Sequence, residues 1–166
     1  QSYDEGAILS CTYDYGRVLA IPFPLEIIRS EGQVTVLYEI GAAVRRIYVE
    51  PRQPPDTQAT WLGSSAGKWE EGTLVVKITK LRPGYFFNGK VLEHDGNLVV
   101  IEGYTPYSDE TVITERYSVN AAGDQLTIMR TIEDPKYYSR AWDMTTVYEP
   151  ADVIYPYECE FRPYEE

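Results

Sequence analysis

The chain has 166 residues, and its 26 Asp and Glu outweigh 15 Lys and Arg to give a formal net charge of −11 at pH 7. This length suits one domain, and a surface this acidic repels phosphate, which argues against nucleic acid and anionic membranes as partners. No apolar run approaches the roughly 18 residues of a membrane helix, so we expect no membrane insertion. The 15 Tyr, 4 Phe and 3 Trp are too many aromatic residues for a disordered chain.

The N-terminal part of the chain is rich in glycine and proline, so residues 1–24 are predicted to be an irregular segment packed on a single domain at 25–166. The chain begins with Gln1 and not with Met, which we interpret as the result of signal removal and hence of a periplasmic or secreted location. A terminus trimmed for expression is the alternative. Cys11 and Cys159 lie near opposite ends, and such a pair predicts a disulfide that ties the ends together; two separate buried thiols are the alternative.

After the first segment the hydrophobic period is two, which is typical of strands. The predicted strands are, in chain order, 25–29, 33–40, 43–49, 64–69, 73–81, 90–93, 97–104, 111–119, 124–132, 141–149 and 155–161. Prolines at 50–56 interrupt this series, and we expect a crossover there on the rim of the fold. The only helix candidate is a turn near 134–137.

About nine to eleven strands at spacings of about ten residues, joined by tight turns, predict a mainly β fold with little helix. A meander of this length removes its exposed edges most simply by closing on itself. We therefore expect a single antiparallel up-and-down β-barrel of the lipocalin (calycin) type. A two-sheet sandwich is the alternative.

Several short motifs follow one another in an order that resembles a known family. They are Pro22-Phe23-Pro24-Leu25-Glu26-Ile27, Val44-Arg45-Arg46-Ile47-Tyr48, Trp61-Leu62-Gly63-Ser64-Ser65-Ala66-Gly67-Lys68-Trp69, Thr73-Leu74-Val75-Val76, Glu115-Arg116-Tyr117 and Ile132-Glu133-Asp134-Pro135. The series is similar to a family of exported hypothetical proteins of proteobacteria and acidobacteria. The resemblance implies export and a lipocalin-like barrel, and it lends no activity. Where such proteins often have His-Ser, this chain has Tyr107-Ser108.

The residues for several common chemistries are missing from the sequence. One His and two Cys do not make a typical zinc or copper site, and the chain has no phosphate-binding glycine loop or dinucleotide fingerprint. We therefore expect no metal and no cofactor. His94, in the turn Glu93-His94-Asp95-Gly96, is either an exposed turn residue or a general acid/base at the mouth of the barrel.

Charged residues within strands are the most informative candidates. Neighbouring residues of a strand face opposite sides, so one of Arg45 and Arg46 points into the barrel, and so does one of Glu115 and Arg116. An inward arginine needs an acidic partner, which Glu39 or Glu115 could supply. The alternatives are an ion pair that fixes strand register and a polar floor that holds a ligand oxygen.

The candidate site residues divide into two sets. The catalytic candidates are Arg46, Glu115, Tyr38, Tyr117 and His94. The ligand-binding candidates, chosen chiefly as aromatic residues on strands or rim loops, are Glu39, Tyr48, Trp69, Tyr85, Phe86, Tyr104, Tyr107 and Arg116. For each tyrosine, packing is the competing interpretation, because a phenol buries a large apolar area and still offers a hydroxyl.

Three functions fit this pattern. The first is a cofactor-independent enzyme, a lyase or isomerase, that acts by proton transfer on a small aromatic or hydrophobic molecule in the barrel. The second is a non-catalytic carrier or sensor of such a molecule, and the third is a structural envelope protein with a solid core. We expect a monomer or a homodimer in each case.

Overall fold

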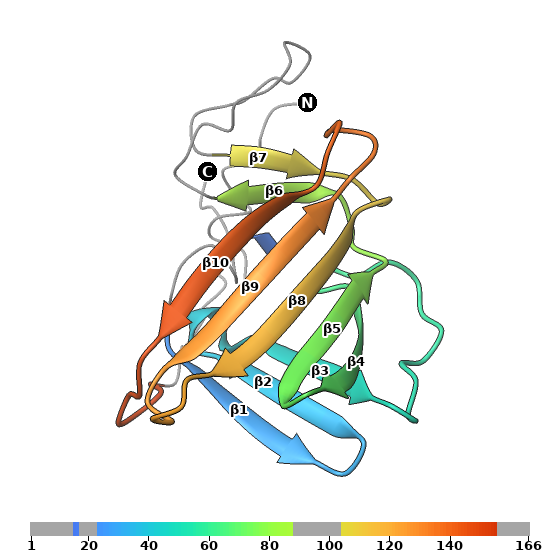
Figure 1. Ribbon diagram of the computed structural model, residues 1–166. Coiled ribbons are helices and arrows are strands. Elements are labelled where there is room, and N and C mark those ends of the chain that lie inside the picture. Colours follow the sequence, from blue (N-terminus) through green and yellow to red (C-terminus); the bar gives the residue numbers. More distant parts are fainter. Residues whose placement is uncertain (1–14, 17–22, 88–103, 156–166) are drawn as a thin grey trace, which may run out of the picture.

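The computed structural model of the protein describes residues 15–16, 23–87 and 104–155, and ten strands and one short 3₁₀ turn lie in these ranges (Figure 1). The elements are β1 (Leu25–Ser30), β2 (Gln33–Tyr38), η1 (Ile40–Ala42), β3 (Val44–Val49), β4 (Ser64–Glu70), β5 (Thr73–Thr79), β6 (Gly84–Phe87), β7 (Tyr104–Tyr107), β8 (Val112–Val119), β9 (Leu126–Glu133) and β10 (Trp142–Tyr148). The predicted mainly β class is confirmed.

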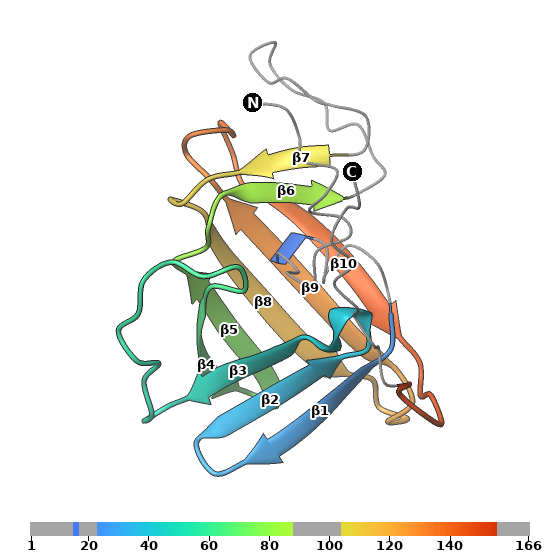
Figure 2. The ribbon, with the colours of Figure 1, turned by 180° about the vertical axis from the view of Figure 1, so that it is seen from behind.

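Eight strands form one curled sheet in the order β1-β2-β3-β4-β5-β8-β9-β10, and β6 and β7 form a separate hairpin. The curl makes a half-barrel, with β1–β3 facing the inner side of β8–β10 (Figure 2). The prediction of a closed barrel is therefore wrong. The two edge strands β1 and β10 do not pair, and prolines adjoin both of them: Pro24 precedes β1, and Pro150 follows close after β10. Proline has no N–H to donate to a sheet ladder, which suits these positions at the ends of the two edge strands.

The sequence led us to expect a purely antiparallel sheet, and this prediction is also wrong. β3 and β4 are parallel, with Ile47 opposite Ser65, Tyr48 opposite Ala66 and Val49 opposite Gly67. The proline-rich stretch, placed correctly by the sequence, makes this possible: a connection from Val49 to Ser64 is long enough to bring the chain back to the same end of the sheet. All other adjacent pairs of the large sheet are antiparallel.

The remaining predicted elements have mixed outcomes. The hairpin of β8 and β9 and the first hairpin of β1 and β2 match the predicted segments within a few residues. The strands predicted at 90–93 and most of 97–104 lie outside the described residues, as does nearly all of 155–161. Residues 134–137 form a turn in which the Tyr137 and Tyr138 amides donate to the Asp134 carbonyl.

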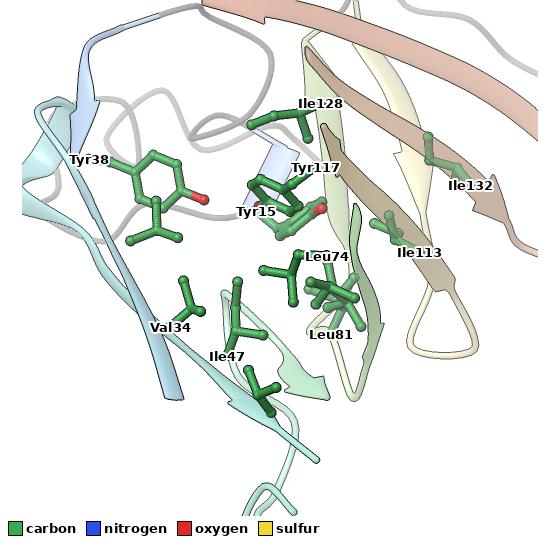
Figure 3. Packing of buried hydrophobic residues seen from close by; sticks show 14 of the residues in the cluster. Tyr15, Val34, Tyr38, Ile47, Leu74, Leu81, Ile113, Tyr117, Ile128 and Ile132 are labelled. Carbon is green, nitrogen blue, oxygen red and sulfur yellow. The ribbon is translucent and has the colours of Figure 1, made fainter. Parts of the chain in front are cut away.

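The core fills the concave side of the half-barrel. Alternating residues of β2, β3, β8 and β9 point there, among them Val34, Ile47, Ile113 and Ile128, which are almost fully buried (Figure 3). Tyr15 belongs to the same cluster, and its amide donates to the Trp61 carbonyl at 2.9 Å. Residues 15–16 thus pack inside the curve of the sheet.

Candidate functional site

Charged residues occur in the core of the half-barrel, where apolar side chains are the rule. Period-two alternation along β8 directs Ile113, Glu115 and Tyr117 to the concave side. Arg130 of β9 lies directly opposite Glu115 in the β8–β9 pair, and Arg45 reaches the same place from β3. Arg45 is 3% exposed, and Glu115 and Arg130 are 0% exposed.

The Glu115 carboxylate accepts four hydrogen bonds, two at each oxygen, from two arginines and two tyrosines. Its Oε1 atom accepts from the Tyr15 hydroxyl at 2.6 Å and from Arg130 Nε at 3.1 Å. Its Oε2 atom accepts from Arg45 Nη1 at 2.7 Å and from the Tyr117 hydroxyl at 2.9 Å. We call Tyr15, Arg45, Glu115, Tyr117 and Arg130 the arginine–glutamate cluster.

Each arginine of the cluster is also held by a hydroxyl on a neighbouring strand. Arg45 Nε donates to Ser65 Oγ at 3.0 Å, and Arg130 Nη1 donates to Thr146 Oγ1 at 2.8 Å. The Nη2 atom of each arginine is buried and has no hydrogen-bond partner among the described residues. Two planar guanidinium groups are thus fixed in orientation while each keeps a donor group unused.

The electrostatics keep Glu115 charged. Burial acts to raise the pKa of its carboxyl, but the positive charges of Arg45 and Arg130 and the hydrogen bond from Tyr15 together lower that pKa below its usual value. Burial raises the pKa of the Tyr15 and Tyr117 hydroxyls well above the usual range, and the Glu115 charge raises both further. Near neutral pH the two phenols are therefore neutral donors to an ionised carboxylate.

An apolar pocket of about 190 Å³ reaches the core beside this cluster. Its lining residues are Ile27, Arg29, Val34, Trp69, Gly72, Leu74, Tyr117, Val119 and Leu126. Tyr117 contributes to the wall of the pocket, while its hydroxyl belongs to the cluster. At the rim, the Arg29 guanidinium lies 5.1 Å from the ring centroid of Trp69, which is a cation–π arrangement.

Two larger hollows lie elsewhere, and both are more open grooves. One of about 550 Å³ runs between the start of β3 and the connection to β4, and includes Arg46, Tyr48 and Trp61. The other, of about 620 Å³, separates the edge strand β1 from the end of β10. The first groove is also lined by the buried Arg45 of the cluster and by its partner Ser65, whereas no member of the cluster lines the second.

The expectation that one residue of each charged pair faces inward is confirmed. The inward arginine is Arg45, and Arg46 is exposed on the outer face. The inward residue of the second pair is Glu115, whereas Arg116 points out and donates to Glu70 at 3.3 Å. Of the catalytic candidates, the structure brings Glu115, Tyr117 and Tyr38 together in the core, since Tyr38 of β2 points into the same space as Tyr15 and Tyr117 (Figure 3).

The ligand-binding candidates are dispersed. Trp69 lines the rim of the apolar pocket, whereas Tyr48 lies in the outer groove. Glu39 accepts from the Tyr155 amide at 3.0 Å, outside the cluster. Tyr107 is buried in β7, where it lies directly opposite Gly84.

Some candidates cannot be placed. The backbones of Tyr85, Phe86 and Tyr104 belong to β6 and β7, but their side chains lie outside the described part of the structure. His94 and the cysteines Cys11 and Cys159 lie outside the described residues, so the predicted disulfide and the predicted acid/base role stay predictions.

Two members of the cluster are missing from the candidates drawn from the sequence. Arg130 had a usable signal, because it shares its strand face with Ile128 and Ile132 in an alternating segment. Tyr15 had none, because it precedes the first strand in an irregular segment. Arg45 was recognised as one of two alternatives.

Metals, membranes and relatives give no further guide to the site. Within the three described ranges, no group of three His, Cys, Asp or Glu residues lies close enough to hold a metal ion, and no helix has the length and hydropathy of a membrane span. No protein-family model, curated protein or solved structure matches the chain, so the family resemblance stays a prediction made from its motifs.

Proposed function

We propose that the protein binds a small apolar or aromatic molecule in the pocket beside Tyr117 and acts as a carrier or sensor that does not alter it. The observation that carries this proposal is the apolar pocket of about 190 Å³ that ends at a phenol of the buried cluster. A cavity of about 150 Å³ lined by apolar side chains is large enough to bind benzene. The pocket therefore suits a ligand with one or two small rings.

The cluster supports binding better than proton transfer. A general base works best with a pKa near the working pH, and the two arginines lower the pKa of Glu115. The phenols of Tyr15 and Tyr117 have raised pKa values and are weak acids at neutral pH. Fixed charges of this kind orient a ligand and hold the wall of its pocket in place.

The test uses indole as a neutral aromatic probe, with calorimetry to measure its affinity. Leu126, half-buried at the pocket wall, is replaced by Trp to fill the space, and the matched control places the same residue at Val147, which is exposed and does not line the pocket. We expect Leu126→Trp to weaken indole binding at least about tenfold, because the ligand loses its contact area, and Val147→Trp to leave it unchanged. Equal affinity in all three proteins would refute the pocket as the site.

A second measurement separates a carrier from the enzyme expected from the sequence. Native mass spectrometry of protein purified from its own host identifies any ligand retained in the pocket. Incubation of that ligand with fresh protein then returns it at unchanged mass and with an unchanged spectrum if the protein is a carrier. Conversion to an isomer or to elimination products would replace this proposal with catalysis.

A further inference from the structure

The arginine–glutamate cluster carries more positive than negative charge. Arg45 and Arg130 each contribute one positive charge, and Glu115 is the only carboxylate within hydrogen-bond distance of either among the described residues. The one other buried charged residue of this part of the chain, Asp134, is held separately by Ser108 and Thr111. Among the described residues, one unit of buried positive charge therefore has no counter-charge.

The unused hydrogen-bond donors belong to the same two residues. Arg45 and Arg130 each engage two of their three side-chain nitrogens, and the third, Nη2, is buried without a partner in the described structure. A buried charge without a counter-ion is unfavourable, and so is a buried donor without an acceptor, and proteins avoid both by pairing them. Excess charge and free donors thus point to the same missing partner.

We propose that the cluster binds one compact monovalent anion, a halide or a carboxylate, through the Nη2 groups of Arg45 and Arg130. The anion makes the cluster neutral and accepts the donor hydrogens that have no acceptor among the described residues. A water molecule accepts the same hydrogens but leaves the charge in place, so the charge distinguishes the two occupants. Ser65 and Thr146 fix the two guanidinium groups, which keeps the site formed before the anion arrives.

The first test uses the wild-type protein and chloride. The thermal unfolding midpoint, Tm, is followed as sodium chloride replaces sodium gluconate, a bulky anion, at constant ionic strength. We expect Tm to rise by about 5–10 °C once chloride reaches about 100 times its Kd, because the ion binds the folded state only. A crystal grown with bromide is expected to show an anomalous peak within hydrogen-bonding distance of Nη2 of Arg45 or Arg130. No chloride effect on Tm, or a water in place of bromide, would overturn the proposal.

Two variants change the charge of the cluster in opposite directions. Arg45→Met makes it neutral, so the chloride effect on Tm is expected to disappear, whereas Glu115→Gln adds a further unpaired positive charge and is expected to enlarge the effect. Arg116→Met is the matched control, because it removes an exposed arginine from the neighbouring position of β8 and leaves the buried charge unchanged. Equal chloride effects in the three variants would contradict the site. If a cluster variant does not fold, the bromide crystal of the wild type decides.

A further arm identifies the source of the anion and rests on the proposed function. Benzoate combines a carboxylate with a ring that suits the pocket, and benzyl alcohol is its neutral counterpart. If benzoate competes with chloride and Leu126→Trp blocks benzoate binding, the anion is the carboxylate head group of the pocket ligand. Chloride binding that Leu126→Trp leaves unchanged, with no benzoate competition, identifies a free ion. Chloride binding without any indole binding refutes the pocket function alone.

Discussion

At the scale of single residues, the interior is organised by one carboxylate. Glu115 accepts hydrogen bonds from two guanidinium groups and two phenols that come from four separate places in the chain. Its period-two position predicted that either it or Arg116 faces inward, and the structure shows which. Its contact with Arg130 was not predictable to the same degree, because a hairpin closed at 119 and 124 pairs Glu115 with Ile128. The actual hairpin closes at Val119 and Leu126, which pairs Glu115 with Arg130.

The buried carboxylate predicts a specific dependence of stability on acid. At pH 7 Glu115→Gln is expected to lower the free energy of unfolding by about 3–5 kcal/mol, because it leaves two buried arginines without their counter-charge. The folded-state pKa of Glu115 lies below its usual value of 4.5, so its contribution is complete above that value. It is lost as the pH falls through the lower, folded-state pKa.

Urea unfolding of wild type and variant at a series of pH values measures this effect. The stability difference is expected to narrow only below pH 4.5, as the wild-type carboxylate gains its proton. Glu70→Gln, which changes an exposed carboxylate, is the control and should alter the stability little at any pH. A difference that stays constant from pH 7 to the acid limit of folding would show that folding does not lower the pKa of Glu115.

At the scale of elements, close packing between strands leaves no room for a side chain at one glycine. The start of β4 follows Gly63, which has a positive φ of 67°. A Cβ atom there would lie 2.8 Å from Ile78 Cγ2 and 2.8 Å from the Thr79 carbonyl oxygen. The sequence has small residues around this glycine, and the structure shows close packing there. The sequence did not indicate that β4 runs parallel to β3, because strand direction depends on a connection whose path leaves no periodic signal.

A pair of glycine variants separates backbone strain from this close contact. Gly63→Ala and Gly72→Ala both put a side chain at positive φ, but the Cβ at Gly72 meets no atom within 4 Å. We expect Gly72→Ala to cost about 1 kcal/mol of unfolding free energy and Gly63→Ala to cost about 2–4 kcal/mol, because strain and overpacking add. Urea unfolding measures both. Equal losses would show that the sheet yields to the added methyl group.

At the scale of the whole molecule, the open sheet and the acidic net charge have opposite effects on association between copies. Within the described part of the chain, β1 and β10 are the edges of the half-barrel, and exposed apolar side chains lie on both, including Ile28 and Val147. Edge strands of this kind pair with other chains unless charge or shape prevents it. A net charge of −11 opposes such pairing at neutral pH, because the copies repel one another. The sequence revealed this charge but not the open edges, because its periodicity is the same for an open and a closed sheet.

The edges predict association in acid. Near the pI of about 4.6 the repulsion between copies disappears, so sedimentation velocity is expected to show a monomer at pH 7.5 and dimers or larger species at pH 5. Ile28→Lys puts a charge on the β1 edge and is expected to suppress this association. Val44→Lys makes the same kind of change at an exposed residue of the internal strand β3 and serves as the control. Suppression by both variants alike would mean that charge number, and not the edge, controls association.

The parallel junction of β3 and β4 has a consequence for how the chain divides. Only three residue pairs join these strands, and the long connection between them leaves β1–β3 as one meander and the rest of the large sheet as another. A nick in that connection would yield two fragments, one with Tyr15 and Arg45 and the other with Glu115, Tyr117 and Arg130. Each fragment would hold an incomplete set of charges that only the other completes. Their reassembly would then be selective, because the buried Arg45–Glu115 ion pair forms only when the two halves come together.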